Sequence, residues 1–284
     1  MTTSASRKRY AVVGNPVAHS RSPFIHRQFA HQTGLALEYD TIQAPLDAFE
    51  ARVVDFFANG GSGLNITVPF KERAFTMAQD HLSDRARLAG AVNTLWMEQG
   101  AIHGCNTDGV GLLDDLLRLG HAPTEKRILL IGAGGAARGA AFPLLQAGCA
   151  QLCIVNRSPQ RATQLAAELG RQLPDMAARL SAGGFEGSAG TWDIVINATS
   201  TSLTQAPLDL PGLNYAPDSL AYDLVYTAAP TSFMRHAQRL GVTDVADGLG
   251  MLVAQAAASF AIWHGTTPLI EPVLLAVRDQ LVAS

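Results

Sequence analysis

A glycine-rich turn near the middle of the chain has the residue types and spacing that bind a phosphate-bearing cofactor. Apolar residues 128–131 precede it and an alanine-rich segment follows, which is the strand–turn–helix context of a dinucleotide site. Gly132 permits the tight turn, Gly134 lets the backbone approach a pyrophosphate, and the helix N-terminus offers free N–H groups. A tight turn without a ligand is the alternative, but a second apolar strand at 152–155 argues against it. The cofactor-binding residues expected in this turn are Gly132, Ala133, Gly134, Gly135 and Ala136.

The residues after that second strand indicate which dinucleotide would bind. NAD sites usually place an Asp or Glu there, which holds the ribose 2′-hydroxyl. This chain instead has Asn156, Arg157 and Ser158, followed by Arg161, with no carboxylate to repel a phosphate. Two guanidinium groups can hold a 2′-phosphate with forked hydrogen bonds, so we predict an NADP(H) site. The alternative is that both arginines are solvated residues of a loop and a helix start.

Lys71 and Asp108 have the residue types of an acid–base pair. Lys71 follows Phe70 and is expected in the first turn of a helix that Pro69 opens. The helix dipole disfavours a cation there, which favours proton release near neutral pH, as general acid–base catalysis requires. Asp108 is expected to cap the helix 109–119, where N–H donors would keep it ionised as the partner of a lysine. The alternatives are a solvated lysine and a carboxylate that only caps.

Polar residues at the ends of expected strands and helices in the first hundred residues could bind a carboxylate-bearing ligand. Ser22 is expected as the N-cap of a helix, and capping alone would also explain its presence. Ser20 lies just before that helix N-terminus, where N–H groups attract a carboxylate. Thr67 and Asn93 lie on expected strands, where either could instead be an ordinary surface residue.

Length, composition and charge limit the classes of protein to which the chain can belong. Its 284 residues exceed one average domain, and 48% hydrophobic residues support a substantial core. The formal charge of −3, without basic blocks, gives no indication of nucleic acid or a membrane surface as a partner. Three cysteines without metal-binding spacing predict no metal site and fit a reducing cytoplasm. No signal peptide or membrane span is expected, because the apolar runs are too short.

Hydrophobic periodicity predicts two α/β modules. An N-terminal module of about a hundred residues precedes a doubly wound, parallel-sheet module of roughly 140. A flexible loop is expected at 183–190, and the buried helix 249–263 could pack on either module. The other expected elements are strands at 9–13, 37–42, 64–68, 128–131, 152–155, 193–197, 220–224 and 242–245, a hairpin over 92–104, and helices at 22–33, 46–57 and 109–119.

A series of short motifs runs almost from one end of the chain to the other. They are Gly14-Asn15-Pro16 with His19-Ser20-Arg21-Ser22-Pro23, Asn65-Ile66-Thr67-Val68-Pro69-Phe70-Lys71, Gly90-Ala91-Val92-Asn93-Thr94, Asn106-Thr107-Asp108-Gly109, Asn197-Ala198-Thr199-Ser200 and Asp247-Gly248-Leu249-Gly250-Met251-Leu252-Val253-Ala254-Gln255. Each motif is short, but the ordered set is specific. The chain resembles the shikimate dehydrogenase family.

The resemblance implies reversible, NADPH-dependent reduction of 3-dehydroshikimate to shikimate, a step of aromatic amino acid biosynthesis, by a monomer or homodimer. It implies a substrate domain at 1–107, a Rossmann NADP(H)-binding domain at 108–247, and C-terminal helices at 248–284 that return to the substrate domain. Lys71 and Asp108 would be the catalytic pair. The resemblance places Ser20, Ser22, Thr67, Asn93, Asp108, Tyr226 and Gln255 on the substrate, and adds Thr199, Ser200 and Gly248 to the cofactor site.

The chain departs from the family pattern at two positions. Cys105 stands where relatives carry an acidic or aromatic residue, and Ser202 stands where the family often has glycine. A glycine at 202 could adopt a positive φ that serine resists, which affects the expected loop 199–202. Two other functions remain open. One is a quinate/shikimate dehydrogenase of broader specificity, and the other is a cofactor-binding regulatory protein without catalysis.

Overall fold

The computed structural model describes residues 7–204 and 208–283, which divide into two compact units. The first unit contains the chain up to Asp108 together with Val253–Val277, and the second contains Gly109–Leu252 and the chain from Arg278 onward. This division differs from the expected one because the start of one C-terminal helix and the end of the other belong to the second unit. Arg278 is held there by its bonds to the Asp247 carboxylate, 2.5 and 2.8 Å, and to the Thr227 carbonyl, 3.0 Å.

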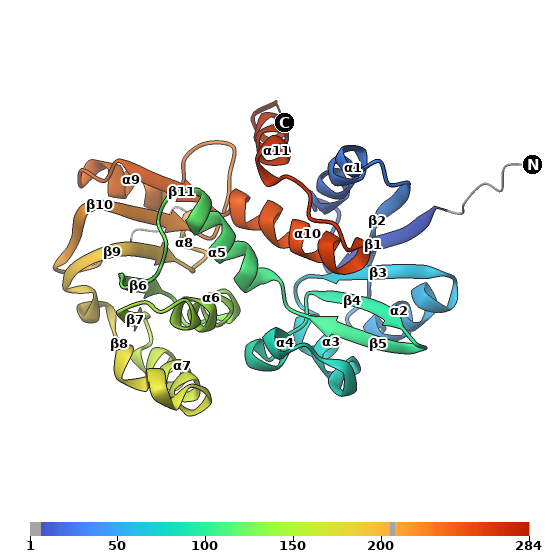
Figure 1. The fold of residues 1–284 in the computed structure, drawn as a ribbon. Helices are drawn as coiled ribbons and strands as arrows, with labels where there is room; N and C mark the ends of the chain where they lie inside the picture. Colours follow the sequence, from blue (N-terminus) through green and yellow to red (C-terminus); the bar gives the residue numbers. More distant parts are fainter. Residues whose placement is uncertain (1–6, 205–207, 284) are drawn as a thin grey trace, which may run out of the picture. The chain divides into compact units, whose positions relative to one another are not determined.

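The first unit contains a mixed sheet of strand order β2-β1-β3-β4-β5 (Figure 1). Strand β1 pairs in parallel with both β2 and β3, whereas β3, β4 and β5 form antiparallel pairs. The antiparallel β4–β5 pair is the expected hairpin. The strands are β1 (Lys8–Gly14), β2 (Leu37–Gln43), β3 (Gly61–Ile66), β4 (Thr94–Glu98) and β5 (Ala101–Cys105), and the intervening helices are α1 (Ser22–Thr33), α2 (Phe49–Ala58), α3 (Lys71–Met77), the short η1 (Gln79–His81) and α4 (Asp84–Ala89).

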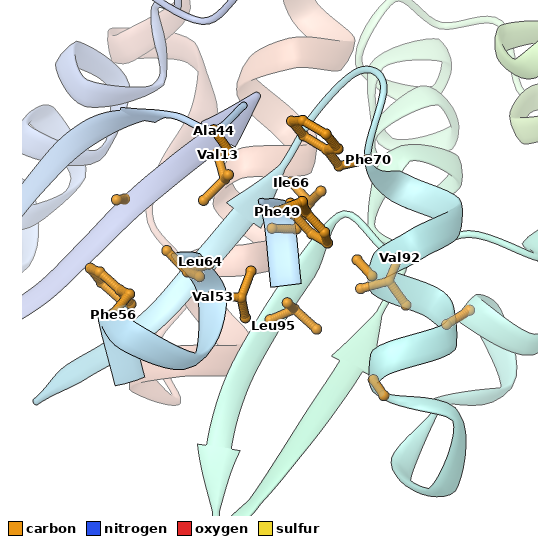
Figure 2. Close-up of a cluster of buried hydrophobic side chains, with 14 of the residues drawn as sticks. Val13, Ala44, Phe49, Val53, Phe56, Leu64, Ile66, Phe70, Val92 and Leu95 are labelled. Carbon is orange, nitrogen blue, oxygen red and sulfur yellow. The ribbon is translucent and has the colours of Figure 1, made fainter. Parts of the chain in front are cut away.

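Strand alternation divides the apolar residues of this unit between the two faces of the sheet. Ala11 and Val13 of β1 belong to a core that includes α2 and α3, in which Phe49 and Phe70 stack with ring centroids 4.6 Å apart (Figure 2). Tyr10 and Val12 belong to a second cluster on the other face, which includes Tyr39 and Trp263. Because successive side chains of a strand point to opposite faces, one strand serves both cores.

The second unit is a six-stranded parallel sheet of order β11-β10-β9-β6-β7-β8, which confirms the doubly wound fold. From β6 the chain adds β7 and β8 on one side and then β9, β10 and β11 on the other, so the order reverses between β6 and β9. Such a switch point is where open α/β sheets bind ligands. The strands are β6 (Arg127–Ile131), β7 (Gln151–Val155), β8 (Leu180–Gly183), β9 (Gly190–Asn197), β10 (Leu213–Asp223) and β11 (Asp244–Asp247).

The first of the remaining helices precedes β6, and the others connect these strands or follow them (Figure 1). Gly265 ends α10 with a φ of +67°, as expected for a left-handed helix stop. None of the helices in the described residues is long and apolar enough to cross a membrane. They are α5 (Asp108–Arg118), α6 (Gly135–Gln146), α7 (Pro159–Gln172), η2 (Pro174–Arg179), η3 (Phe185–Ser188), α8 (Thr201–Thr204), α9 (Ser232–Arg239), α10 (Leu249–His264) and α11 (Ile270–Ala283).

Three local expectations were wrong. The segment expected as a flexible loop at 183–190 contains the end of β8 and the helix η3. The few apolar residues of this segment did not indicate either element. Pro69 does not open α3, which begins at Lys71; Pro69 follows a cis peptide bond and is exposed. Strand β3 also ends two residues early, at Ile66, and leaves Val68 64% exposed.

Candidate functional site

Lys71 and Asp108 form an ion pair in the first unit, with 2.6 Å between Nζ and Oδ2. Lys71 is the first residue of α3, and Asp108 is the first residue of α5, so two helix starts that are 37 positions apart in the sequence meet here. Both side chains remain partly exposed, 30% for Lys71 and 17% for Asp108. The pair therefore combines a fixed geometry with access from solvent, which a group that exchanges protons with a substrate requires.

The start of α5 differs from the expected cap. Asp108 lies inside the helix, and the side chain of Asn106 accepts the Asp108 backbone N–H at 3.0 Å. The Asp108 carboxylate bonds two side chains outside the helix, Lys71 through Oδ2 and Asn93 through Oδ1 at 2.9 Å. The prediction that Asp108 caps this helix was therefore wrong, while its pairing with a lysine is confirmed.

Asn93 is the centre of the polar contacts around this pair and is only 2% exposed. Its Nδ2 lies 2.9 Å from Asp108 Oδ1 and 3.2 Å from Gln255 Oε1. Its Oδ1 accepts the backbone N–H of Thr107 at 2.9 Å, which establishes which end of the amide is oxygen. We call Lys71, Asn93, Thr107, Asp108 and Gln255 the acid–base cluster.

Ser20, Ser22 and Thr67 lie at the ends of other elements of the first unit, the serines at the start of α1 and Thr67 after β3. The backbone N–H of Ser22 donates to Ser20 Oγ at 3.3 Å, and Ser22 is the first residue of α1, so the expectation that Ser22 is the N-cap was wrong. Thr67 follows β3 and bonds back to Val13 through its backbone N–H at 2.9 Å. A Cβ on Gly14 would lie 2.4 Å from Thr67 Cγ2, so glycine is required at 14 for this approach.

The glycine-rich turn lies at the switch point of the second-unit sheet. Gly132 has φ +116°, and a Cβ there would lie 3.2 Å from both the Ala198 carbonyl and the Thr199 methyl. Gly132 therefore lets the turn after β6 approach the loop after β9. Thr199 is fixed in that loop because its hydroxyl donates to Asn197 Oδ1 at 2.6 Å. Ser200, next in the chain, is exposed.

The helix that follows this turn presents its N-terminus to solvent. Gly134, Gly135 and Ala136 are exposed, no side chain caps α6, and a Cβ on either glycine would meet no atom within 4 Å. Ala133 is half-buried beside them. Uncapped N–H groups with open space in front fit a phosphate group, so the residues present fit a dinucleotide.

Arg157 and Arg161 are both exposed beyond the end of β7, at the same edge of the sheet. Within residues 7–204 and 208–283, neither guanidinium forms an ion pair with a carboxylate. Asn156 is fixed by a 3.0 Å bond from Nδ2 to the Ser158 carbonyl, and the Ser158 hydroxyl bonds Gln160 at 3.2 Å. The arrangement leaves two cations available to an anionic group, as a 2′-phosphate site requires.

Ser202 has a structural role that the sequence did not reveal. It lies in α8, without the positive φ considered for this position, and is 7% exposed. Its hydroxyl donates to Asp223 Oδ2 at 2.5 Å and accepts from Asn197 Nδ2 at 3.2 Å. Burial raises the pKa of Asp223, and the bond from Ser202 offsets part of that shift. The serine thus fixes the ends of β9 and β10 to each other.

Gly248 and Tyr226 lie in the second unit, after β11 and β10. A Cβ on Gly248 would lie 2.2 Å from the Leu224 carbonyl oxygen, so only glycine fits at this position. Tyr226 is half-buried. Thus Gly132, Thr199, Asn156 and Gly248 all follow strand ends at the carboxyl edge of one parallel sheet; we call these strand ends and their loops the cofactor edge.

Sequence reasoning missed the residues that surround Asn93. Thr94 and Ser259 are fully buried hydroxyls 2.7 Å apart, and Asn65 lies 2.9 Å from Ser259. A signal for Ser259 was available, because it follows Gln255 by four residues and so shares its helix face. Its partners were not deducible, because they lie 152 to 194 residues away in the sequence.

The three cysteines belong to neither the acid–base cluster nor the cofactor edge. Cys105, Cys149 and Cys153 are free and buried, and burial raises the pKa of Cys149 to about 11. At 4% exposure, Cys105 has the environment of an unreactive, packed thiol. In the described part of the chain, no three His, Cys, Asp or Glu side chains come together where they could hold a metal ion.

Comparison with protein families gives matches over most of the chain. Residues 12–95 match the shikimate dehydrogenase substrate binding domain, and residues 118–205 match the shikimate / quinate 5-dehydrogenase family. Residues 248–278 match the shikimate 5'-dehydrogenase C-terminal domain.

Individual relatives extend over the whole length. Shikimate dehydrogenase (NADP(+)) of Bordetella avium is 56% identical over 283 residues, which cover 100% of this chain and 99% of the relative. The crystal structure of shikimate 5-dehydrogenase from Thermus thermophilus in complex with NADP(H) and shikimate is 36% identical, with a TM-score of 0.85, and the match covers 96% of this chain and 100% of that one. An Ael1 enzyme from Pseudomonas putida is 45% identical with a TM-score of 0.84, covering 96% and 98%.

Proposed function

The chain belongs to the shikimate dehydrogenase family, and we propose that it catalyses the reversible, NADPH-dependent reduction of 3-dehydroshikimate to shikimate. It is an NADP-dependent oxidoreductase that acts on a CH–OH group of a small molecule. The single observation that carries the proposal is the partly exposed Lys71–Asp108 ion pair, since a regulatory protein without catalysis has no need of it.

Lys71 supplies the proton in this mechanism. When bound, NADPH provides the hydride that reduces the C3 carbonyl of the substrate. The carbonyl oxygen gains negative charge as the carbon is reduced, and the Lys71 ammonium gives it a proton to form the hydroxyl. In the direction of oxidation, neutral Lys71 accepts the hydroxyl proton. Asp108 fixes Lys71 at 2.6 Å and compensates its charge in the protonated state.

The substrate-binding roles rest on the chemistry of the side chains. Ser20 and Ser22 would donate to the substrate carboxylate at the start of α1. Thr67, Asn93 and Gln255 would hold the ring hydroxyls. Tyr226, from the second unit, would contribute its phenol. The half-buried state of Gln255 supports its part in this set.

The cofactor-binding roles rest on the open helix N-terminus and the exposed arginines. The backbone of Gly132, Ala133, Gly134, Gly135 and Ala136 would hold the pyrophosphate. Asn156, Arg157, Ser158 and Arg161 would hold the adenosine ribose and its 2′-phosphate. Thr199, Ser200 and Gly248 would contact the nicotinamide half of NADP(H).

Initial rates with two substrates and two cofactors test this proposal. We expect the purified chain to oxidise shikimate with NADP, with much lower rates when quinate replaces shikimate or NAD replaces NADP. The name of the matched 118–205 family includes quinate, so comparable rates with quinate would favour an enzyme of broader specificity. Binding of NADP without turnover of either substrate would overturn the proposed activity. We also expect the protein to be cytoplasmic. We expect a monomer or homodimer, and gel filtration of the pure protein would check this oligomeric state.

A further inference from the structure

A chain of buried polar contacts leads from Tyr39 of β2 to the catalytic carboxylate. Tyr39 Oη lies 2.7 Å from Asn65 Oδ1, and Asn65 Nδ2 lies 2.9 Å from Ser259 Oγ. Ser259 Oγ lies 2.7 Å from Thr94 Oγ1, which in turn lies 2.9 Å from Asn93 Oδ1. Asn93 Nδ2 then bonds Asp108 Oδ1 at 2.9 Å. The residues between Tyr39 and Asp108 are all at most 7% exposed, so water does not compete for these groups.

The contacts of this series are compatible with hydrogen bonds that all run toward Asp108. Asn93 Oδ1 accepts the backbone N–H of Thr107, so it can only accept from Thr94. The single hydroxyl hydrogen of Thr94 is then used, so Thr94 accepts from Ser259. Ser259 Oγ also lies 3.1 Å from the Gln255 carbonyl, which competes for its single hydrogen, but the 2.7 Å contact to Thr94 is the shorter of the two. With that hydrogen on Thr94, Ser259 accepts from the Asn65 amide.

The hydrogen bonds between Tyr39 and Ser259 agree with this direction. Asn65 Nδ2 also lies 3.2 Å from the Asn93 carbonyl, which can only accept, so this end of the Asn65 amide is the donor. Tyr39 must therefore donate to Asn65 Oδ1. Burial raises the pKa of Tyr39 well above its usual value, which keeps this phenol protonated as a donor. The side chain of Ser22 hydrogen-bonds to the same phenol. When Ser259 donates to Thr94, each bond of the series from Tyr39 runs toward Asp108, and Asn93 Nδ2 also donates to Thr107 and Gln255.

We propose that Ser259 is a positioning residue of the reaction, which fixes Asn93 and thereby the Lys71–Asp108 pair through this series of buried contacts from Tyr39. Ser259 is the member that joins the amide of Asn65 to the hydroxyl of Thr94, and it is 0% exposed. Hydrogen bonds that share a direction polarise one another in a low-dielectric interior, so with Ser259 donating to Thr94 the series delivers a stronger donor to Asp108 than Asn93 would alone. The proposal rests on the proposed function, because it assigns Ser259 to the same reaction.

The chain begins next to a residue proposed to bind the substrate. Ser22 would donate to the substrate carboxylate and now bonds Tyr39, whereas Asp108 holds the proton-transferring lysine at the other end. Ser259 therefore connects the two ends of the substrate site within one unit. Ser259 lies on α10, one turn beyond Gln255, which already belongs to the acid–base cluster.

Kinetics of Ser259→Ala, Tyr39→Phe and the double variant test the proposal. We expect Ser259→Ala to lower kcat about tenfold, as for partners in one buried network, with KM for shikimate changed less than about twofold. Tyr39→Phe should lower kcat less, because the contacts from Ser259 through Thr94 and Asn93 to Asp108 remain. The double variant should be no slower than Ser259→Ala, because Tyr39 acts on Asp108 only through Ser259, and that connection is already lost in Ser259→Ala. Ser188→Ala is the matched control, because it removes an equally buried hydroxyl of the second unit.

Three results would overturn the proposal: an unchanged kcat in folded Ser259→Ala, an effect on KM alone, or losses that multiply in the double variant. If Ser259→Ala does not fold, Tyr39→Phe decides, because the ring and its packing are kept; a normal kcat there would contradict the chain. Wild-type turnover of shikimate and its loss in Lys71→Ala are measured in the same series. Failure of those two results would refute the proposed function, whereas failure of Ser259→Ala alone would refute only the positioning role.

Discussion

In the first unit the side chains of the acid–base cluster are bonded to one another, whereas the cofactor edge of the second unit presents exposed arginines and backbone N–H groups. The acid–base cluster joins Lys71, Asp108 and Asn93 through contacts of 2.6 and 2.9 Å. At the cofactor edge, Gly134 and Gly135 present bare N–H groups, and Arg157 is exposed.

The difference follows from what each region has to bind. Proton transfer needs one lysine held in one orientation, so the cluster fixes it with neighbouring side chains before the substrate arrives. A pyrophosphate and a 2′-phosphate carry strong charge, so exposed N–H groups and flexible guanidinium groups suffice to bind them. Variants in the two regions should therefore change different kinetic constants.

The largest effect is expected from Lys71→Ala. Loss of a general acid costs about 10²–10⁴ in kcat, and KM for shikimate should change far less if Lys71 acts in the transition state. NADP affinity, measured by fluorescence titration, should remain within about twofold, because Lys71 is not part of the cofactor edge. Lys126→Ala, which removes a half-buried lysine of the second unit, should retain normal kcat. A normal kcat with a raised KM in Lys71→Ala would make Lys71 a binding residue.

Arg157→Ala should change the kinetic constants for NADP and leave kcat nearly unchanged. A charge-assisted contact to the 2′-phosphate contributes ~1.5–3 kcal/mol, so the preference for NADP over NAD should fall roughly tenfold to a hundredfold. KM for NAD and kcat should remain nearly unchanged, because only the phosphate contact is lost. The comparison of kcat/KM for the two cofactors checks this. An equal loss with NAD would show that Arg157 does more than hold the phosphate.

Sequence and structure agree most closely where the determinants are local. The turn at Gly132 and the arginine pair were predictable because a strand, a glycine pattern and a helix start follow one another within about thirty residues. The family motifs identified Lys71 and Asp108, and the structure joins them. The buried network of Asn65, Thr94 and Ser259 was not predictable, because its partners come from distant segments and hydroxyls carry no periodic signal. The predictions of Ser22 and Asp108 as helix caps were wrong because each is the first residue of its helix. Its backbone N–H is accepted by a side chain two residues earlier, Ser20 and Asn106 respectively.

Acid should destabilise the first unit through a buried histidine. Burial, and then the nearby His264, lower the pKa of His26 to about 3, whereas an unfolded histidine titrates near 6.5. Between these values the unfolded state binds the extra proton, so the free energy of unfolding falls as the pH falls through this window. The linkage predicts a loss of about 2 kcal/mol from about pH 7 to about pH 5.

Urea unfolding at the two pH values measures that loss. In His26→Phe the difference between the two pH values should shrink by most of this amount, since the titrating group is gone. His31→Phe, at an exposed site of the same helix, should leave the difference unchanged. If His26→Phe kept the full acid dependence, other groups would be responsible for it.

Ser202→Ala should give the smallest effect, on stability alone. It removes the Ser202 donor from the buried Asp223 carboxylate, which still accepts from Thr231, from the Val225 backbone N–H and from Asn197. We expect the free energy of unfolding to fall by about 1–2 kcal/mol, with kcat nearly unchanged. Thr191→Ala, at an exposed threonine of β9, is the control and should have no effect in the same denaturation series. A loss of turnover without a loss of stability would instead place Ser202 in the cofactor site.

Chemical rescue of Lys71→Ala by a small primary amine tests the central claim, that the first unit supplies the proton, most directly. Added ethylamine can occupy the space left beside Asp108 and act as the acid or base in place of the lysine. We predict that kcat of Lys71→Ala rises with ethylamine concentration, while kcat of the wild type and of Arg157→Ala does not. No rise in kcat at any ethylamine concentration, in a folded variant that binds shikimate and NADP normally, would contradict the role of Lys71 as the proton donor.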